Sequence, residues 1–123
     1  MDEVEISRRR MRQRAVELLY QIELTGKSLL EICEYADPPV LPLQKEWISK
    51  IWAERENLDQ LIKTASHEWR IERMGYVERN ILRLALYEIN YDKTPIPIAI
   101  DEAVELAKLY SGEEAGIVRE NGE

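Results

Sequence analysis

Residues 76–91 read YVERNILRLALYEINY, and this stretch decides the fold. Apolar side chains recur along it at intervals of three and four residues, as they do on a helix, and they cover most of its circumference. Only Arg79, Asn80 and Arg83 form a polar strip. Because a helix that is apolar on most sides is surrounded by other elements, we expect residues 76–91 to be the central helix of an all-α fold.

Similar spacing predicts further helices on both sides of this segment. Ser7 and Ser28 are suited to cap the first turns of two of them, because serine oxygens accept hydrogen bonds from free backbone N–H groups. Residues 54–57 contain no apolar side chain, which predicts a break with Asn57 as the next N-cap. Residues 69–75 are expected to form a connector that contains one helical turn. The other expected helices span residues 8–24, 29–35, 42–53, 58–65 and 97–110.

The length of 123 residues suits one domain that spans residues 1–123. We expect residues 1–6 to be a loose acidic arm. Residues 113–123 should form a short irregular tail, because Ile117 and Val118 are their only large apolar side chains. The sequence has no run of about 18 apolar residues that would span a membrane, and its N-terminus lacks the apolar region of a secretory signal. We therefore expect a cytoplasmic protein.

Few side chains are suited to catalysis or to holding a cofactor. The single cysteine, Cys33, cannot form an internal disulfide and has the character of a small core residue. The single histidine, His67, cannot build a metal site alone. The sequence contains no glycine-rich phosphate loop and none of the HExxH, CxxC and GxSxG motifs. It therefore predicts no enzyme, no cofactor and no metal.

The charge distribution points to a binding function. The net charge of −7 alone argues against nucleic acid as a partner, but residues 8–14 read RRRMRQR and contain five arginines. On a helix, Arg9, Gln13 and Tyr20 lie within about 40° of one another, opposite the apolar stripe. Guanidinium groups neutralise phosphates and an aromatic ring stacks on an unpaired base, which favours single-stranded RNA. The candidate RNA-binding residues are Arg8, Arg9, Arg10, Arg12, Arg14 and Tyr20.

Two charged features have alternative interpretations. The arginine-rich segment is either an RNA surface, a solvated face with Tyr20 packed beside Val16, or a surface for an acidic protein. In the expected helix of residues 76–91, Glu78 and Glu88 lie on the same faces as apolar side chains, where burial of an unpaired acid is unfavourable. We expect Glu88 to pair with an arginine. Glu78, at the exposed start of the helix, either caps it or contacts a basic partner. The arginines considered for such pairs are Arg55, Arg70, Arg73 and Arg79.

Three segments carry a resemblance to a known family. They are residues 8–24 (RRRMRQRAVELLYQIEL), 69–89 (WRIERMGYVERNILRLALYEI) and 96–116 (IPIAIDEAVELAKLYSGEEAG). In this order and spacing they are similar to the NusB family of bacterial transcription antitermination and ribosomal-RNA-processing factors. Residues 27–60 match that family only in helical character. The resemblance implies an all-α fold of two small three-helix bundles that share a core.

The resemblance also implies a function. Members of the family bind the boxA element of nascent ribosomal RNA together with ribosomal protein S10 (NusE), and this pair nucleates an antitermination complex on RNA polymerase. The arginines of residues 8–14, with Tyr20 nearby, match the helix that contributes RNA contacts. Glu78, Glu113 and Glu114 match acids in the region that faces NusE and RNA. The alternative is a non-enzymatic helical protein-interaction module that binds no RNA.

The sequence departs from the family pattern after the last expected helix. The family continues with a (K/R)FVNGVL motif and a final helix, whereas residues 116–123 read GIVRENGE. We therefore expect roughly a few hundred Å² of apolar surface on the second bundle to lie uncovered. The expected consequence is a homodimer, a compensating repacking of the bundle or lowered stability.

Overall fold

The computed structural model describes residues 7–65 and 70–111. Within them every regular element is helical, so the expected all-α fold is confirmed, and none of these helices combines the length and apolarity of a membrane-spanning segment. The expected N-terminal arm, the tail and the residues His67, Glu113 and Glu114 lie outside the described residues. The elements are α1 (Arg8–Thr25), α2 (Leu29–Glu34), α3 (Pro42–Ala53), α4 (Arg55–Ala65), the 3₁₀ turn η1 (Ile71–Arg73), α5 (Tyr76–Asn90) and α6 (Ile96–Ser111).

Local hydrogen bonds set the ends of the first two helices. The Ser7 hydroxyl accepts the N–H of Arg10 at 3.1 Å and caps α1, which Gly26 closes with a left-handed φ of 75°. Ser28 and Glu31 form a reciprocal capping box at the start of α2, with distances of 3.2 and 2.9 Å. Both predicted serine caps are confirmed.

The predicted start of the fourth helix is wrong. Helix α4 begins at Arg55, because the N–H of Leu58 already donates to the Glu54 carbonyl at 2.9 Å. The Asn57 amide donates to Glu54 Oε1 at 2.9 Å instead of capping the helix. The break between α3 and α4 is therefore the single residue Glu54.

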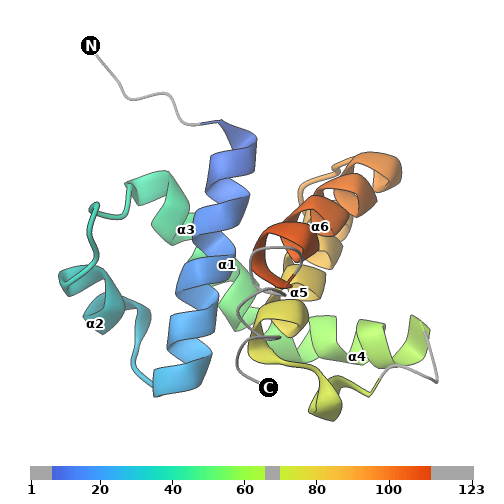
Figure 1. The fold of residues 1–123 in the computed structure, drawn as a ribbon, viewed down its shortest axis with the longest axis horizontal. Helices are drawn as coiled ribbons and strands as arrows, with labels where there is room; N and C mark the ends of the chain where they lie inside the picture. Colours follow the sequence, from blue (N-terminus) through green and yellow to red (C-terminus); the bar gives the residue numbers. More distant parts are fainter. Residues whose placement is uncertain (1–6, 66–69, 112–123) are drawn as a thin grey trace.

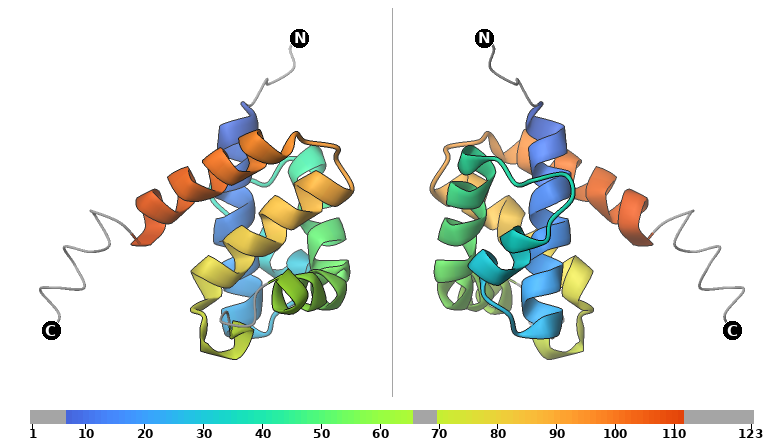
Figure 2. Two further views of the ribbon diagram at one scale, coloured as in Figure 1. Left: turned by 90° about the vertical axis from the view of Figure 1, so that its right-hand side faces the viewer. Right: turned by 90° about the vertical axis from the view of Figure 1, so that its left-hand side faces the viewer.

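Helix α5 is the centre of the arrangement, as its sequence predicts. It contacts α1, α3, α4 and α6. In Figure 1, α1, α2 and α3 lie mainly to the left and α4, α5 and α6 to the right, and Figure 2 shows that the C-terminal half of α6 projects beyond the other helices. Both groups contribute to one hydrophobic core, which agrees with two three-helix bundles that share a core. Its most deeply buried aliphatic side chains include Leu18, Leu19, Ile48, Ile51, Leu58 and Leu84.

A buried ion pair joins α1 to α5. The Arg12 guanidinium donates to both carboxylate oxygens of Glu88, from Nε at 2.6 Å and from Nη2 at 2.8 Å, and the Thr94 hydroxyl donates to the same carboxylate at 3.0 Å. Arg12 is 5% exposed and Glu88 is 1% exposed, so each charge depends on the other instead of on water. The expectation that Glu88 pairs with an arginine is confirmed, but its partner is Arg12 and none of the four arginines considered.

The polar strip of α5 forms a second link to α1, about three helical turns along α1 from the first. Glu23 of α1 accepts hydrogen bonds from Arg79 at 2.9 Å, Asn80 at 3.0 Å and Arg83 at 3.0 Å. Arg83 also donates to both carboxylate oxygens of Asp59 in α4, at 2.7 and 2.8 Å. The strip therefore points into the protein and ties α1, α4 and α5 together.

An open apolar groove lies between α4, α5 and α6. It has a volume of about 680 Å³ and is lined by Ile81, Leu82 and Ala85 of α5 and by Ile100 and Val104 of α6, among others. Ile100 and Val104 are 53% and 47% exposed. Within residues 7–65 and 70–111 this apolar surface is uncovered, in agreement with the expectation. The homodimer, the repacking and the lowered stability stay predictions.

Removal of the Glu88 carboxylate should leave the Arg12 charge buried without a partner. We expect the free energy of unfolding of Glu88→Leu to fall by about 3–5 kcal/mol, the usual effect of deleting one member of a buried ion pair. The double variant Arg12→Met/Glu88→Leu should recover most of this loss, because apolar side chains of similar volume often replace such a pair without penalty. Urea unfolding followed by circular dichroism measures both changes.

The matched control for this experiment is Lys50→Ala, which removes an exposed ion pair with Glu46. Its free energy of unfolding should stay close to that of the wild type, because exposed pairs contribute little. A double variant that is no more stable than Glu88→Leu would show that the loss does not come from the unpaired charge of Arg12.

Candidate nucleic-acid interface

The five arginines of residues 8–14 lie in different environments, because successive residues of a helix are turned by about 100°. Arg8 lies toward α3 and the end of α5. Its Nη2 donates to the Asp92 carboxylate at 3.1 Å, and its guanidinium carbon lies 5.2 Å from the centre of the Trp47 ring. The Trp47 indole donates to the same oxygen of Asp92 at 3.1 Å. The Arg8 side chain is 50% exposed, so a ligand can still reach it.

Arg9 forms a surface contact between α1 and α6. It donates to the two carboxylate oxygens of Glu102, from Nε at 3.2 Å and from Nη2 at 2.9 Å. This hydrogen-bonded contact is the main cause that lowers the pKa of Glu102 below its ordinary value, and the charge of Arg12 lowers it further. The Arg9 side chain is 57% exposed, and exposed ion pairs contribute little to stability. The Arg9 guanidinium therefore stays accessible from solvent although it is paired with Glu102.

Arg12 is not available to a ligand. Its guanidinium is held by Glu88 and also lies 3.6 Å from Glu102, inside the core. A sequence signal for this burial exists, because Arg12 lies about 20° from Leu19 around α1 and so falls within the apolar stripe. The sequence-based assignment of Arg12 to RNA contacts does not fit this buried position, so Arg12 is not part of the accessible arginine surface.

Arg10 and Arg14 lie on the other flank of α1, toward the loop between α2 and α3. Arg10 is exposed, and its guanidinium has no hydrogen bond or ion pair within residues 7–65 and 70–111. Arg14 donates from Nη2 to the Pro38 carbonyl at 2.5 Å, while its buried Nε has no partner in the described part of the chain. Arg8, Arg9 and Arg10 thus form the accessible cationic end of α1.

Tyr20 packs against the first turn of α5. Its ring stands edge-on to Tyr76, with ring centroids 6.5 Å apart and planes at 63°. The guanidinium carbon of Arg79 lies 5.4 Å from the centre of the Tyr76 ring. Tyr20 is half-buried and lies about 15 Å along α1 from Arg10. Packing of Tyr20 on a neighbouring helix agrees with one interpretation of the sequence, which missed Tyr76 as a second ring.

Glu78 caps α5, which is one of its two expected roles. Its Oε1 accepts the N–H of Gly75 at 2.9 Å, the position and contact of a capping-box acid. The side chain is otherwise exposed. Contact of Glu78 with a basic partner stays a prediction, as do the roles of Glu113 and Glu114, which lie outside the described residues.

The acids that hold the exposed arginines are the feature that sequence analysis missed. Asp92 is 84 residues from Arg8 and Glu102 is 93 residues from Arg9, and no local pattern connects such distant positions. Their carboxylates lower the positive charge at this end of α1 well below what five arginines suggest.

Comparison with known proteins identifies the family. The model of the NusB family matches residues 9–118. The chain belongs to the NusB family. The transcription antitermination protein NusB of Myxococcus xanthus is 36% identical over 120 residues, which cover 89% of this chain and 86% of that protein. The NusB protein of Pelotomaculum thermopropionicum is 39% identical over 118 residues, covering 90% of this chain and 82% of that protein.

Solved structures of NusB proteins have the same fold. T. maritima NusB superposes with a TM-score of 0.74 at 34% identity, over 94% of this chain and 86% of that chain. A crystal structure of the antitermination factors NusB and NusE in complex with double-stranded RNA gives a TM-score of 0.69 at 28% identity, over 92% of this chain and 91% of that chain. The expected NusB-like architecture is therefore confirmed.

Proposed function

We propose that this chain binds single-stranded RNA of the boxA type and acts with NusE as a transcription antitermination factor. One observation carries the proposal: Arg8, Arg9 and Arg10 lie together at the exposed end of α1, where another anion can replace the carboxylate partners of Arg8 and Arg9. Family membership supports the antitermination role, because the relatives are transcription antitermination proteins and one solved relative is in a complex with NusE and double-stranded RNA.

RNA phosphates would take the places of two carboxylates. Asp92 and Glu102 already occupy the positions at which an anion meets Arg8 and Arg9, and a phosphate offers the same paired acceptor oxygens. Arg10 supplies a third contact. Three phosphate contacts to a single strand correspond to a slope of about −2 when the logarithm of the binding constant is plotted against that of the salt concentration.

The mechanism that follows is assembly rather than catalysis. Tyr20 and Tyr76 offer aromatic surface on which an unpaired base can stack. Glu78, together with Glu113 and Glu114 by resemblance, would face the basic protein NusE. RNA and NusE would then bind neighbouring surfaces of this chain in the cytoplasm, and their joint complex would bind RNA polymerase.

The first test replaces two arginines with alanine. We expect the double variant Arg9→Ala/Arg10→Ala to bind a boxA-type RNA about 10-fold more weakly or worse, because each lost contact is a hydrogen bond between charged groups. The salt slope should become shallower by about 1.4, which is two contacts at about 0.7 each. Fluorescence anisotropy at several salt concentrations measures both quantities.

The matched control is Lys63→Ala, since Lys63 also forms an exposed ion pair, with Glu72 at 3.9 Å. Its affinity and salt slope should equal those of the wild type, and a scrambled RNA tests sequence preference. Wild-type affinity in the arginine variant would remove the arginines from the RNA surface. A chain that binds NusE but no RNA would favour the protein-interaction module instead.

The role of Glu78 is tested by Glu78→Gln, which removes the charge but retains an oxygen that can accept the N–H of Gly75. We expect several-fold weaker binding of NusE and unchanged binding of RNA alone, measured by isothermal titration calorimetry. Glu31→Gln is the matched control, because Glu31 has the same capping role in α2. Unchanged NusE affinity in Glu78→Gln would limit Glu78 to capping α5.

A further inference from the structure

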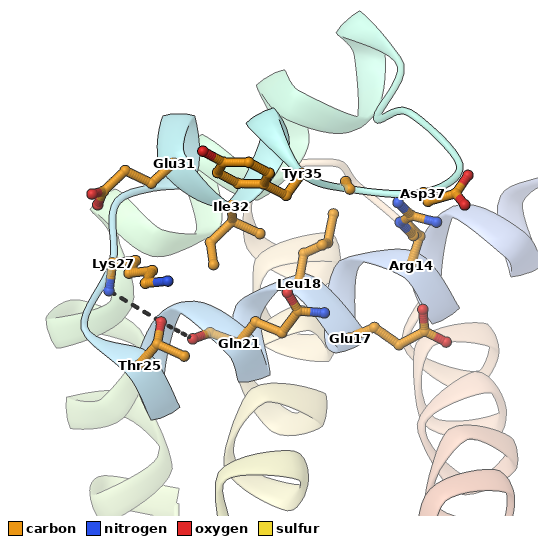
Figure 3. A pocket seen from close by; sticks show the side chains of 11 residues that line it. Arg14, Glu17, Leu18, Gln21, Thr25, Lys27, Glu31, Ile32, Tyr35 and Asp37 are labelled. Carbon is orange, nitrogen blue, oxygen red and sulfur yellow. Dashed lines mark hydrogen bonds between the residues drawn. The ribbon is translucent and has the colours of Figure 1, made fainter.

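A hollow between α1 and α2 lies beside the arginine-rich end of the molecule and has no part in the function proposed so far. Its volume of about 440 Å³ is within the range of small-ligand pockets, ~300–1,000 Å³. Figure 3 shows Leu18 and Ile32 meeting between the two helices and Tyr35 lying across the rim above them. The two aliphatic side chains are buried, whereas Tyr35 is 84% exposed. We call this site the Tyr35 hollow.

A second hollow connects the Tyr35 hollow to the arginines. It has a volume of about 330 Å³, and its lining includes Arg10 and Gln13. Arg14 and Glu17 belong to the lining of both hollows. Arg14 therefore stands at their junction, and its buried Nε is an N–H donor without a partner among the described residues. The two hollows thus lie next to each other along α1, with Arg14 and Glu17 between them.

The acids of the Tyr35 hollow disfavour a phosphate. Glu17 accepts the hydroxyl of Tyr110 at 2.7 Å, and Glu31 accepts the N–H of Ser28 at 2.9 Å, so both carboxylates are fixed by the fold. Asp37 adds a third carboxylate to the lining. A phosphate placed here would meet like charges in a partly enclosed site, which is unfavourable.

The cations of the same hollow disfavour a basic side chain. Arg14 and Lys27 belong to its lining, and Figure 3 shows Arg14 beside Asp37 at one end and Lys27 near Glu31 at the other. Gln21 adds an amide that both donates and accepts hydrogen bonds. A site with an apolar base, mixed polar groups and an exposed aromatic ring suits an uncharged planar group with N–H donors and carbonyl acceptors. A nucleobase is such a group.

We propose that the Tyr35 hollow binds one unpaired nucleobase of single-stranded RNA. A neighbouring phosphate of that strand would lie on Arg10 and Arg14, the base would stack on Tyr35, and its edge would face Gln21 and Asp37. This site rests on the proposed RNA-binding function and adds base recognition to the phosphate contacts of α1.

The test is Tyr35→Ala with a short boxA-type RNA. We expect the affinity to fall by about 5- to 100-fold, the usual effect of losing one base–aromatic stack. The salt slope should stay unchanged, because no charge is removed. Tyr35→Phe should bind like the wild type. Leu30→Ala is the matched control, because Leu30 is 77% exposed on α2, which ends directly before Tyr35, and does not line the hollow.

The base itself is located with RNAs that carry 2-aminopurine at one position at a time. The fluorescence of one position should be quenched when the wild type binds and should be regained with Tyr35→Ala.

If the wild type binds RNA and Tyr35→Ala binds as tightly as Leu30→Ala, the site is rejected and the proposed function stands. If Tyr35→Ala weakens NusE binding but not RNA binding, the hollow is a protein contact. If the wild type binds no RNA, both proposals fail.

Discussion

The buried ion pair between Arg12 and Glu88 is the constraint on which the rest of the structure depends. Because an unpaired charge in the core is strongly unfavourable, the pair fixes both the position of α1 along α5 and its rotation. With Arg12 turned inward, Arg8 lies one turn earlier on nearly the same side of α1, where the core ends. Arg9 is turned toward α6. The buried Arg12 therefore determines where the accessible Arg8 and Arg9 lie, although all three belong to the same arginine-rich segment.

The ion pairs of α1 divide into two kinds with different roles. The pairs of Arg12 and Glu23 are buried or largely buried and hold the helix on α5 at both ends, with the two helices antiparallel. In the pairs of Arg8 and Arg9 the guanidinium groups are exposed and can exchange one anion for another. The backbone of α1 is thus held in place, while Arg8 and Arg9 can exchange their carboxylate partners for phosphates. This combination is compatible with RNA binding by a chain of net charge −7. The excess of acidic residues argues against RNA binding when only the net charge is considered. Two of these acids, Asp92 and Glu102, nevertheless pair with arginines proposed to bind RNA.

The sequence predicts those parts of the fold that depend on local patterns. The central position of α5 follows from its apolar circumference, and the serine caps follow from chemistry within one turn. The wrong prediction for the start of α4 shows the limit of such patterns. Both Glu54 and Asn57 can precede a helix, and only the hydrogen bond from the N–H of Leu58 to the Glu54 carbonyl shows that the helix begins after Glu54. The partners of the arginines were beyond prediction, since they come from α5, α6 and the turn between them. The candidate site was thus proposed from the sequence, while the division of its arginines into buried and exposed ones required the fold.

The central claim is that a carboxylate of this chain competes with RNA for an arginine of α1. The affinity of Glu102→Gln for a boxA-type RNA at low salt tests it directly, because this change removes the competing charge at Arg9 and keeps the size of the side chain. Glu105→Gln makes the same change in charge one turn further along α6. Glu105 acts on Arg9 through its charge alone, without a hydrogen bond, so this variant corrects for the general effect of a lost negative charge. The account predicts several-fold tighter RNA binding by Glu102→Gln than by Glu105→Gln. Equal affinities of the two variants would contradict it.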